Sequence, residues 1–530
     1  MSYCILRLAK IDIMIRENKS LKDSFELISQ VNIAASYEVT VGKAKGHVYM
    51  GRVLNLNYTE GHYAFSVTTK IRKGVQSEKE LEVNRKTEIQ FKNSGLTLYT
   101  KGKNFLYNNV SYPGFEDSSG ESSEKLIQGE INSLSTKRAS FYDKDHYYRA
   151  ILPINKRVRL IDDFSGNGFG IDGRDIFDRL VPIKVNECNY HLYVYTNKNK
   201  ESFFIVDGLD KQVIDVFQRI VNSILLSFAF LKGDYHGQQC YVLSYTSLFF
   251  QKPSSILSVV LGGGIYNGFP VHTTMPLSLL QMQSKIKYKK DADGKIIGLD
   301  TQNIAKYRVP FPNECFSKLC ELIFNKGGVL RAVILFVNNH TASLEMKIPT
   351  LFVALENITK VLVADDTKVF KLIEDDSIIK EIKSAIKPVL KELTVIEGKF
   401  RPKDLNAIEE KEYKAAYARI ATKFHDFNKG TNNKKLIEPF INFGFKLTPE
   451  EEQLIFVYRN KFLHGDDFMT MEESYEIEFK ELFHISMRLH KLISVLLLKA
   501  SGYSGYILNN AKIHEQISQR KLKESVFIKI

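Results

Sequence analysis

The sequence lacks tryptophan and is poor in cysteine, although it holds 26 Tyr and 35 Phe among its 530 residues. The five cysteines are scattered, odd in number and form no CxxC pair. This pattern excludes a disulfide scaffold and is typical of thiols in a reducing compartment. Cys315 and Cys320 lie about 140° apart around a predicted helix, so we expect both in the core and not on one metal ion. No motif indicates a cofactor.

Long apolar runs are also missing. Arg7, Lys10 and Asp12 interrupt the apolar residues near the N-terminus, which therefore lack the core of a signal peptide. The longest apolar stretches, from Ile220 and from Leu492, fall short of the roughly 18 residues that span a bilayer. We expect a cytoplasmic protein without a membrane span.

Charge and composition narrow the class of protein. Apolar residues make up 44 % and charged residues 25 % of the chain, as in a folded protein, which excludes disorder and collagen. Lys plus Arg at 74 against Asp plus Glu at 61 give a net charge of +13. This charge favours a polyanionic partner such as nucleic acid, although a solvated lysine-rich surface accounts for the same total.

The pattern of the N-terminal half predicts strands and turns. Alternating residues rich in Val, Ile, Tyr, Phe and Thr predict strands. These strands are expected at residues 37–41, 47–58, 62–69, 147–154, 181–185, 190–196 and 202–208. A loop is expected at 113–125. Asp210 is expected to cap a buried helix that ends before Gly233.

Two short segments between Tyr241 and Pro312 leave alternatives open. The glycines at 262–264 suit a turn or a phosphate loop, but no GK[ST] follows them. The lysine-rich run at 285–290 suits a backbone-phosphate contact or the edge of a strand.

Helical periodicity begins near Asn313 and continues to the C-terminus. Helices are expected at 315–324, 328–340, 342–363, 376–397, 405–427 and 472–499. We expect a break near Pro388 and a loop at 425–435. The sequence thus predicts an α+β fold with a strand-rich N-terminal half and a C-terminal helical bundle. The expected domains are 1–120, 121–312 and 313–530, of which the first two could form one unit.

One helix start is specified by several residues at once. Thr448 suits an N-cap, Pro449 the first helical position, and Glu451 the capping box. Apolar residues form a stripe along this helix, namely Leu454, Ile455, Tyr458 and Phe462. Gly465 is placed to end the helix.

This capped helix carries Arg459 and His464. Because Gly465 follows, His464 lies in the last turn, where its ring can fold toward Arg459 or across to a partner chain. Arginine carries a permanent planar charge that binds phosphate through two hydrogen bonds, and histidine exchanges protons near neutral pH. Together they suit phosphodiester cleavage.

Other Arg and His residues of the helical half are expected to be structural. Arg419 and His425 have a similar spacing, but they lie in a continuing helix and no glycine follows the histidine. His484 and His490 lack an arginine in the same context.

The run RNKFLHG at 459–465 resembles the R-N-x-x-x-H-G form of the HEPN nuclease motif. The segments VNNHTASLEMKIPTLFVALENITKVL and KASGYSGYIL resemble the early helices and the C-terminal end of ApeA-like HEPN domains. The resemblance extends over roughly residues 313–506, less than half of the chain.

The resemblance implies an all-α HEPN bundle with the activity of a metal-independent endoribonuclease, used in anti-phage defence by abortive infection or as a toxin. It implies that Arg459 binds the scissile phosphate of RNA, that His464 transfers a proton and that Asn460 orients them. It also implies a homodimer through the helical domain. The N-terminal half is then expected to sense a phage-derived or protein trigger, or to restrain the nuclease.

Two other interpretations of the motif remain. In a catalytically silent HEPN module that binds nucleotide or RNA, Arg459 would pair with Glu451, Glu452 or Asp466, and His464 would be a helix-terminal cap. Alternatively, the chain is a scaffold whose strand-rich half recognises a partner protein.

Overall fold

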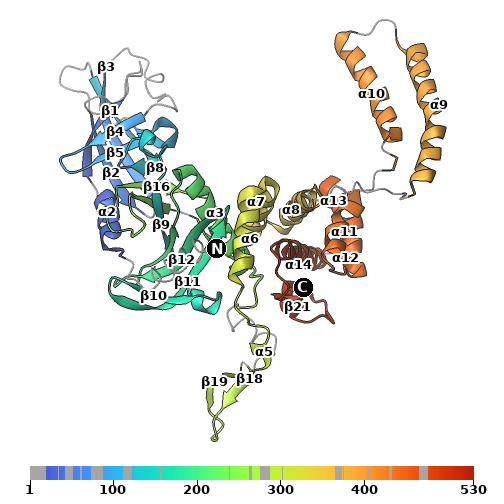
Figure 1. Ribbon diagram of the computed structural model, residues 1–530. Helices are drawn as coiled ribbons and strands as arrows, with labels where there is room; N and C mark the ends of the chain where they lie inside the picture. The colour runs from blue at the N-terminus through green and yellow to red at the C-terminus, as the bar shows by residue number, and fades with distance from the viewer. Residues whose placement is uncertain are drawn as a thin grey trace, which may run out of the picture.

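The computed structural model describes residues 20–33, 35–41, 52–59, 62–72, 88–111, 122–154, 158–237, 239–261, 265–274, 287–300, 302–364, 373, 375–402, 406–425, 427–428, 432–464 and 475–530. The protein has the predicted α+β fold, with a strand-rich N-terminal half and a helical C-terminal half (Figure 1).

An antiparallel sheet dominates the strand-rich half. Within the described residues it has 15 strands in the order β10-β11-β12-β13-β9-β15-β16-β8-β5-β4-β1-β2-β3-β7-β6. These are β1 Ala35–Val41, β2 Arg52–Thr59, β3 His62–Arg72, β4 Glu88–Lys92, β5 Thr97–Lys101, β6 Phe105–Ser111, β7 Ser122–Ile131, β8 Ser133–Ser135, β9 Tyr147–Ile154, β10 Asn167–Ile171, β11 Arg174–Val185, β12 Cys188–Thr196, β13 Ser202–Gly208, β15 Gln239–Tyr245 and β16 Ser255–Val260.

The remaining described strands form three small two-stranded sheets. They pair β14 Asp234–His236 with β17 Ile265–Asn267, β18 Lys287–Lys290 with β19 Ile296–Asp300, and β20 Tyr506–Leu508 with β21 Phe527–Lys529. The strand interpretation of the lysine-rich run is therefore confirmed for Lys287–Lys290, whereas residues 262–264 lie outside the described part of the chain. The loop predicted at 113–125 extends too far along the chain, because β7 begins at Ser122 and pairs with β3.

The strand β8 joins two groups of strands, a first group made of β1–β7 and a second group made of β9–β13, β15 and β16. It pairs with β16 over Ser133–Ser135 and with β5 at one position, Tyr99 opposite Ser135. The sheet consequently runs without interruption from residues of the first expected domain to residues of the second.

Helices cover both faces of the second strand group. Side chains alternate along β9, so that Ile151 packs in a core with α2 (Lys22–Asn32), whereas Leu152 packs in a core with α3 (Ile214–Lys232) on the other face. The result is a layer of sheet between two helices, with α3 facing the helical half (Figure 1).

The helix α3 ends as predicted but begins differently. Gly233 closes it in a left-handed conformation with φ of 79°. Asp210 does not cap it; its carboxylate accepts the backbone N–H of Asn189 at 2.8 Å, and the helix starts after Val213. Among the described helices, α3 is long and apolar enough to cross a bilayer, but it is mostly buried as a core helix of this fold.

The helical half contains two long helices, α8 and α14, that pack on one another. Its elements are α5 Gln302–Ala305, α6 Asn313–Asn325, α7 Gly327–Asn338, α8 Leu344–Ala364, α9 Asp376–Phe400, α10 Ala407–His425, α11 Asn432–Asn442, α12 Pro449–Gln453, η6 Leu454–Tyr458, α13 Arg459–His464, α14 Tyr475–Ala500, α15 Asn510–Ile513 and α16 Glu515–Ser518.

Two predictions about these helices were wrong. The expected break at Pro388 does not occur, because α9 is exposed there and water can bond the carbonyl that proline leaves unpaired. The loop expected at 425–435 ends early, because α11 begins at Asn432 and packs against α8.

One hydrophobic core connects the two halves of the chain. The ring of Phe164, in the strand-rich half, lies 4.8 Å from that of Phe316 on α6, and the ring of Phe230 on α3 lies 5.3 Å from that of Phe336 on α7. Two hairpins, α9 with α10 and β18 with β19, stand away from this body (Figure 1).

Candidate functional site

The predicted helix start at Thr448 is confirmed. The Oγ1 of Thr448 accepts the N–H of Glu451 at 3.3 Å, and the carboxylate of Glu451 accepts the N–H of Thr448 at 2.9 Å. Pro449 occupies the first turn. These contacts satisfy backbone donors that the helix itself leaves unpaired, so they define where the helix begins.

A π-helical turn, η6, interrupts this helix directly before the motif. The sequence pattern predicts a regular helix up to Gly465, and it does not predict the π turn. Leu454 and Ile455 are buried as the apolar stripe requires. Because a π turn inserts extra backbone, it changes the direction in which Arg459 leaves the helix, and such turns are frequent at functional sites.

Arg459 begins α13 and is held by a residue of another helix. Its Nε donates to Oε1 of Glu356 on α8 at 2.6 Å, and its terminal nitrogen pairs with the same oxygen. The side chain of Arg459 is 15 % exposed and that of Glu356 36 %. The guanidinium is therefore oriented by a carboxylate, and the Arg459 side chain as a whole is mostly but not completely buried.

Glu356 is not one of the three acidic partners of Arg459, namely Glu451, Glu452 and Asp466, that the interpretation as a silent module names. Glu451 completes the capping box and pairs with Lys491 at 2.7 Å, and Asp466 lies outside the described residues. Glu356 precedes Arg459 by 103 residues, so only the packing of α13 on α8 brings the two together.

His464 is the last residue of α13, as expected, and Asn460 is its second. The side chains of both, together with Gly465, lie outside what the structure describes. The meeting of Arg459 and His464 around one phosphate therefore stays a prediction.

The second Arg and His pair lies on a separate surface. Arg419 and His425 are exposed on α10, and that helix continues without interruption from one to the other. This placement agrees with the expectation that they do not form a site, and it makes them suitable controls.

The two histidines of α14 are packed in the interior. The Nε2 of His484 lies 2.8 Å from Oε1 of Glu450 at the start of α12. The ring of His490 is tilted by 34° against that of Phe336, and its Nε2 lies 3.2 Å from the Phe269 carbonyl oxygen. Burial lowers the pKa of His484 more than the hydrogen bond with Glu450 raises it. Both histidines therefore have structural partners.

A buried charge cluster that the sequence did not reveal surrounds the start of α12. Arg488, which is almost fully buried, bonds Glu524 at 2.6 Å and Glu450 at 3.1 Å, and Lys491 pairs with Glu451. Burial would raise the pKa of Glu450, but His484 and Arg488 outweigh it and lower the pKa. The cluster connects the capped helix to α14 and to the C-terminal segment.

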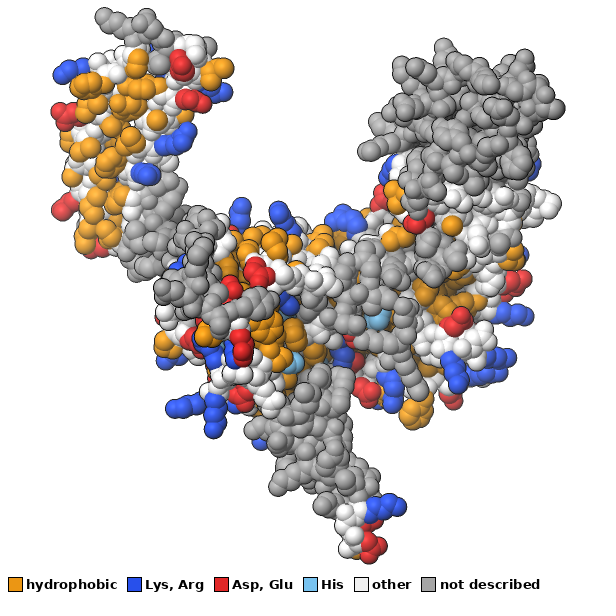
Figure 2. All heavy atoms as spheres, turned by 180° about the vertical axis from the view of Figure 1, so that it is seen from behind, with side chains coloured by type: hydrophobic (Ala, Val, Ile, Leu, Met, Phe, Trp, Pro, Cys, Tyr) orange, Lys and Arg blue, Asp and Glu red, His pale blue; other side chains and the backbone are white. Residues whose placement is uncertain are grey.

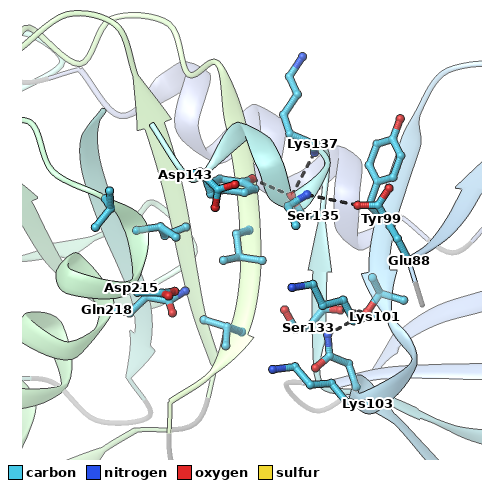
Figure 3. A pocket seen from close by; sticks show the side chains of 18 residues that line it. Glu88, Tyr99, Lys101, Lys103, Ser133, Ser135, Lys137, Asp143, Asp215 and Gln218 are labelled. Carbon is cyan, nitrogen blue, oxygen red and sulfur yellow. Dashed lines mark hydrogen bonds between the residues drawn. The ribbon is translucent and has the colours of Figure 1, made fainter. Parts of the chain in front are cut away.

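A cavity of about 520 Å³ lies where the two strand groups meet. Figure 3 shows Lys101 and Lys103 on one wall, with Asp215 and Gln218 of α3 on the opposite wall. Leu257 on β16 adds apolar surface. A cavity of this size suits a small organic ligand. The sequence could not indicate it, because its walls come from segments more than 100 residues apart.

The described residues contain no group of three or more His, Cys, Asp or Glu side chains arranged to hold a metal ion. Cys188, Cys240, Cys315 and Cys320 are free thiols. Burial raises the pKa of Cys320 to about 12, and Cys315 packs partly buried against the same core, as predicted for both.

No protein-family model, curated protein or solved structure matches this chain.

Proposed function

We propose that this protein is a metal-independent endoribonuclease of the HEPN kind. The main support is α13, which begins at Arg459, ends at His464 and follows a helix start specified by the capping box. The Arg459 side chain is partly exposed and oriented by Glu356, and its guanidinium is the kind of group that bonds phosphate oxygens.

In this reaction the ribose 2′-OH attacks the adjacent 3′-phosphate, and the 5′-oxygen of the next nucleotide leaves with a proton. The products are a 2′,3′-cyclic phosphate and a 5′-OH, so DNA is not a substrate. Arg459 stabilises the charge that develops on the phosphate, His464 transfers the proton, and Asn460 orients them. RNA is the partner, and the net charge of +13 favours its approach.

The proposed biological role is that of a cytoplasmic toxin or abortive-infection effector in antiviral defence. The strand-rich half is proposed to sense a trigger or to restrain the nuclease, and the cavity between its strand groups is a candidate site for this role.

The double variant Lys101→Glu with Lys103→Glu should change growth arrest on expression, because both lysines line that cavity. Lys198→Glu, at an exposed lysine outside the cavity, should not change it.

The activity is tested by incubating purified full-length protein with total RNA in EDTA and mapping the new RNA ends. We expect cyclic phosphate ends with wild type and at least a 100-fold loss with Arg459→Ala and with His464→Ala. Arg419→Ala and His425→Ala, the pair on α10, should cleave like wild type. Absence of cleavage by wild type, or equal loss in both pairs, would overturn the proposal.

A silent RNA-binding or nucleotide-binding module is the second candidate, and the ion pair between Arg459 and Glu356 favours it. A carboxylate that already neutralises the guanidinium competes with a phosphate. RNA binding by wild type without new ends, and with binding lost in Arg459→Ala, identifies this case.

A further inference from the structure

The helices α9 and α10 form an antiparallel hairpin, here named the arm (residues 376–425), that stands away from the body (Figure 1). Its helices are linked by an ion pair between Arg401, directly after α9, and Glu410 on α10, and by a hydrogen bond from the Tyr413 hydroxyl to the Glu397 carbonyl oxygen at 3.4 Å. Most side chains on α9 stay exposed or half-buried. Most of the stability of a helix in a protein comes from packing of its apolar face. Two helices that pack only on each other leave the apolar side chains outside their contact without a cover.

The apolar residues of α9 follow a heptad pattern. Alternating steps of three and four residues connect seven positions: Ile379, Ile382, Ile386, Val389, Leu393, Ile396 and Phe400. A period of 3.5 residues sustained over three heptads is typical of a seam in a coiled coil or a helix bundle.

Part of this seam has no cover within the described chain. Ile396 is 40 % exposed and Phe400 65 %, and Val389 is also exposed. Ile420 adds an exposed apolar side chain on the neighbouring flank of α10. Figure 2 shows that hydrophobic side chains gather along the arm. A continuous apolar stripe of this kind marks an interaction surface.

The charges beside the stripe are self-complementary. Glu409, Ala416 and Lys423 are all exposed and lie seven residues apart, on one face of α10. A two-fold axis through Ala416 places Glu409 of each chain opposite Lys423 of the other. The small side chain at the centre allows the two helices to approach closely.

We propose that the arm binds the arm of a second copy of this chain, in an antiparallel four-helix bundle whose two-fold axis passes through Ala416. The heptad seam supplies the buried apolar surface, and the Glu409 and Lys423 pairs set the register. The proposal rests on the arm alone and is independent of the proposed nuclease activity.

The first test compares two adjacent residues of α9. Ile396 lies in the seam, whereas Val395, 66 % exposed, is turned away from it by about 100°. In sedimentation equilibrium, wild-type protein should be a dimer. Ile396→Glu should weaken dimerisation at least 10-fold, and Val395→Glu should leave it unchanged. A monomeric wild type, which would leave the stripe for a different partner, or equal effects of both variants, overturns the proposal.

The second test examines the two-fold axis. Ala416→Cys places two thiols across the axis, and Ala418→Cys places them on another flank of the same helix. Under mild oxidation of the full-length protein, Ala416→Cys should form a disulfide-linked dimer at least 10-fold faster than Ala418→Cys. Equal rates in a dimeric protein show that a different surface forms the dimer, and they also overturn the proposal.

Discussion

At the scale of single residues, the ion pair between Arg459 and Glu356 is the main feature of the motif. The carboxylate orients the guanidinium, and it also competes with any phosphate for the same charge. A ligand must therefore share Arg459 with Glu356 or displace it. The sequence motif contains only one of these two residues.

Glu356→Gln tests this competition. The amide keeps an acceptor for Arg459 but removes the negative charge, so the affinity for RNA should rise about 3- to 10-fold, measured by fluorescence anisotropy in the His464→Ala background. Glu410→Gln, which removes the carboxylate that pairs with Arg401 on the arm, is the matched control. Unchanged or weaker binding by Glu356→Gln would show that orientation matters more than competition.

At the scale of elements, the start of α12 is specified locally, and the π turn after it is not. Thr448, Pro449 and Glu451 act within four residues, so their effect is visible in the sequence. The π turn depends on how Leu454 and Ile455 reach a core to which segments from both halves of the chain contribute. Only that packing decides where the helix changes its winding.

Thr448→Ala should destabilise the protein by about 1 kcal/mol, because it removes the side-chain acceptor for the N–H of Glu451. Hydrogen exchange should speed up in residues 449–464 before the rest of the protein changes. Thr394→Ala, an exposed threonine within α9, should change the stability by less than about 0.5 kcal/mol. Equal effects of the two variants would argue that the cap is dispensable.

At the scale of the whole molecule, the two halves share one core and are not independent units. Phe164 and Phe230 of the strand-rich half pack against α6 and α7. His272 forms a β-bridge with Ile507 and packs against Tyr503. A change in the packing of the strand-rich half would therefore also change the packing of α6 and α7 in the helical half.

We expect residues 313–530 expressed alone to be insoluble or molten. Removal of the strand-rich half exposes the faces of α6 and α7 that α3 covers, including Phe336. Solubility and cooperative thermal unfolding, compared with the full-length protein, measure this. A soluble fragment with one sharp transition would show that the shared core is not required. If the fragment is insoluble or molten, as expected, loss of toxicity on truncation reflects unfolding rather than regulation.

The junction between the halves should weaken in acid. Burial, and then the charge of Lys232, lower the pKa of His272 from its usual value to about 3. Because the unfolded state takes up a proton first, the free energy of unfolding falls as pH drops from about 6.5 toward 3, by up to about 4 kcal/mol at about 1.4 kcal/mol per pKa unit. His272→Asn should flatten this slope in urea denaturation, whereas His425→Asn on the arm should not. An unchanged slope in His272→Asn would assign the acid sensitivity to other groups.

Much of the fold could be predicted from local sequence patterns. Alternation of β-branched and aromatic residues indicated β1, β9 and β13, and Gly233 indicated the end of α3. The cap predicted at Asp210 was wrong, because its carboxylate accepts the backbone N–H of Asn189 on β12. The same local pattern of a helix cap therefore served a tertiary contact instead.

The sequence by itself determined the α+β order of the halves, the capped helix and the positions of Arg459 and His464 on it, because these depend on residues within a few turns of one another. Only the tertiary structure decided that Glu356 holds Arg459, that a cavity lies between the strand groups, and that the heptad seam on α9 stays uncovered. These features depend on the packing of segments far apart in the chain, and no short-range pattern of side chains specifies that packing.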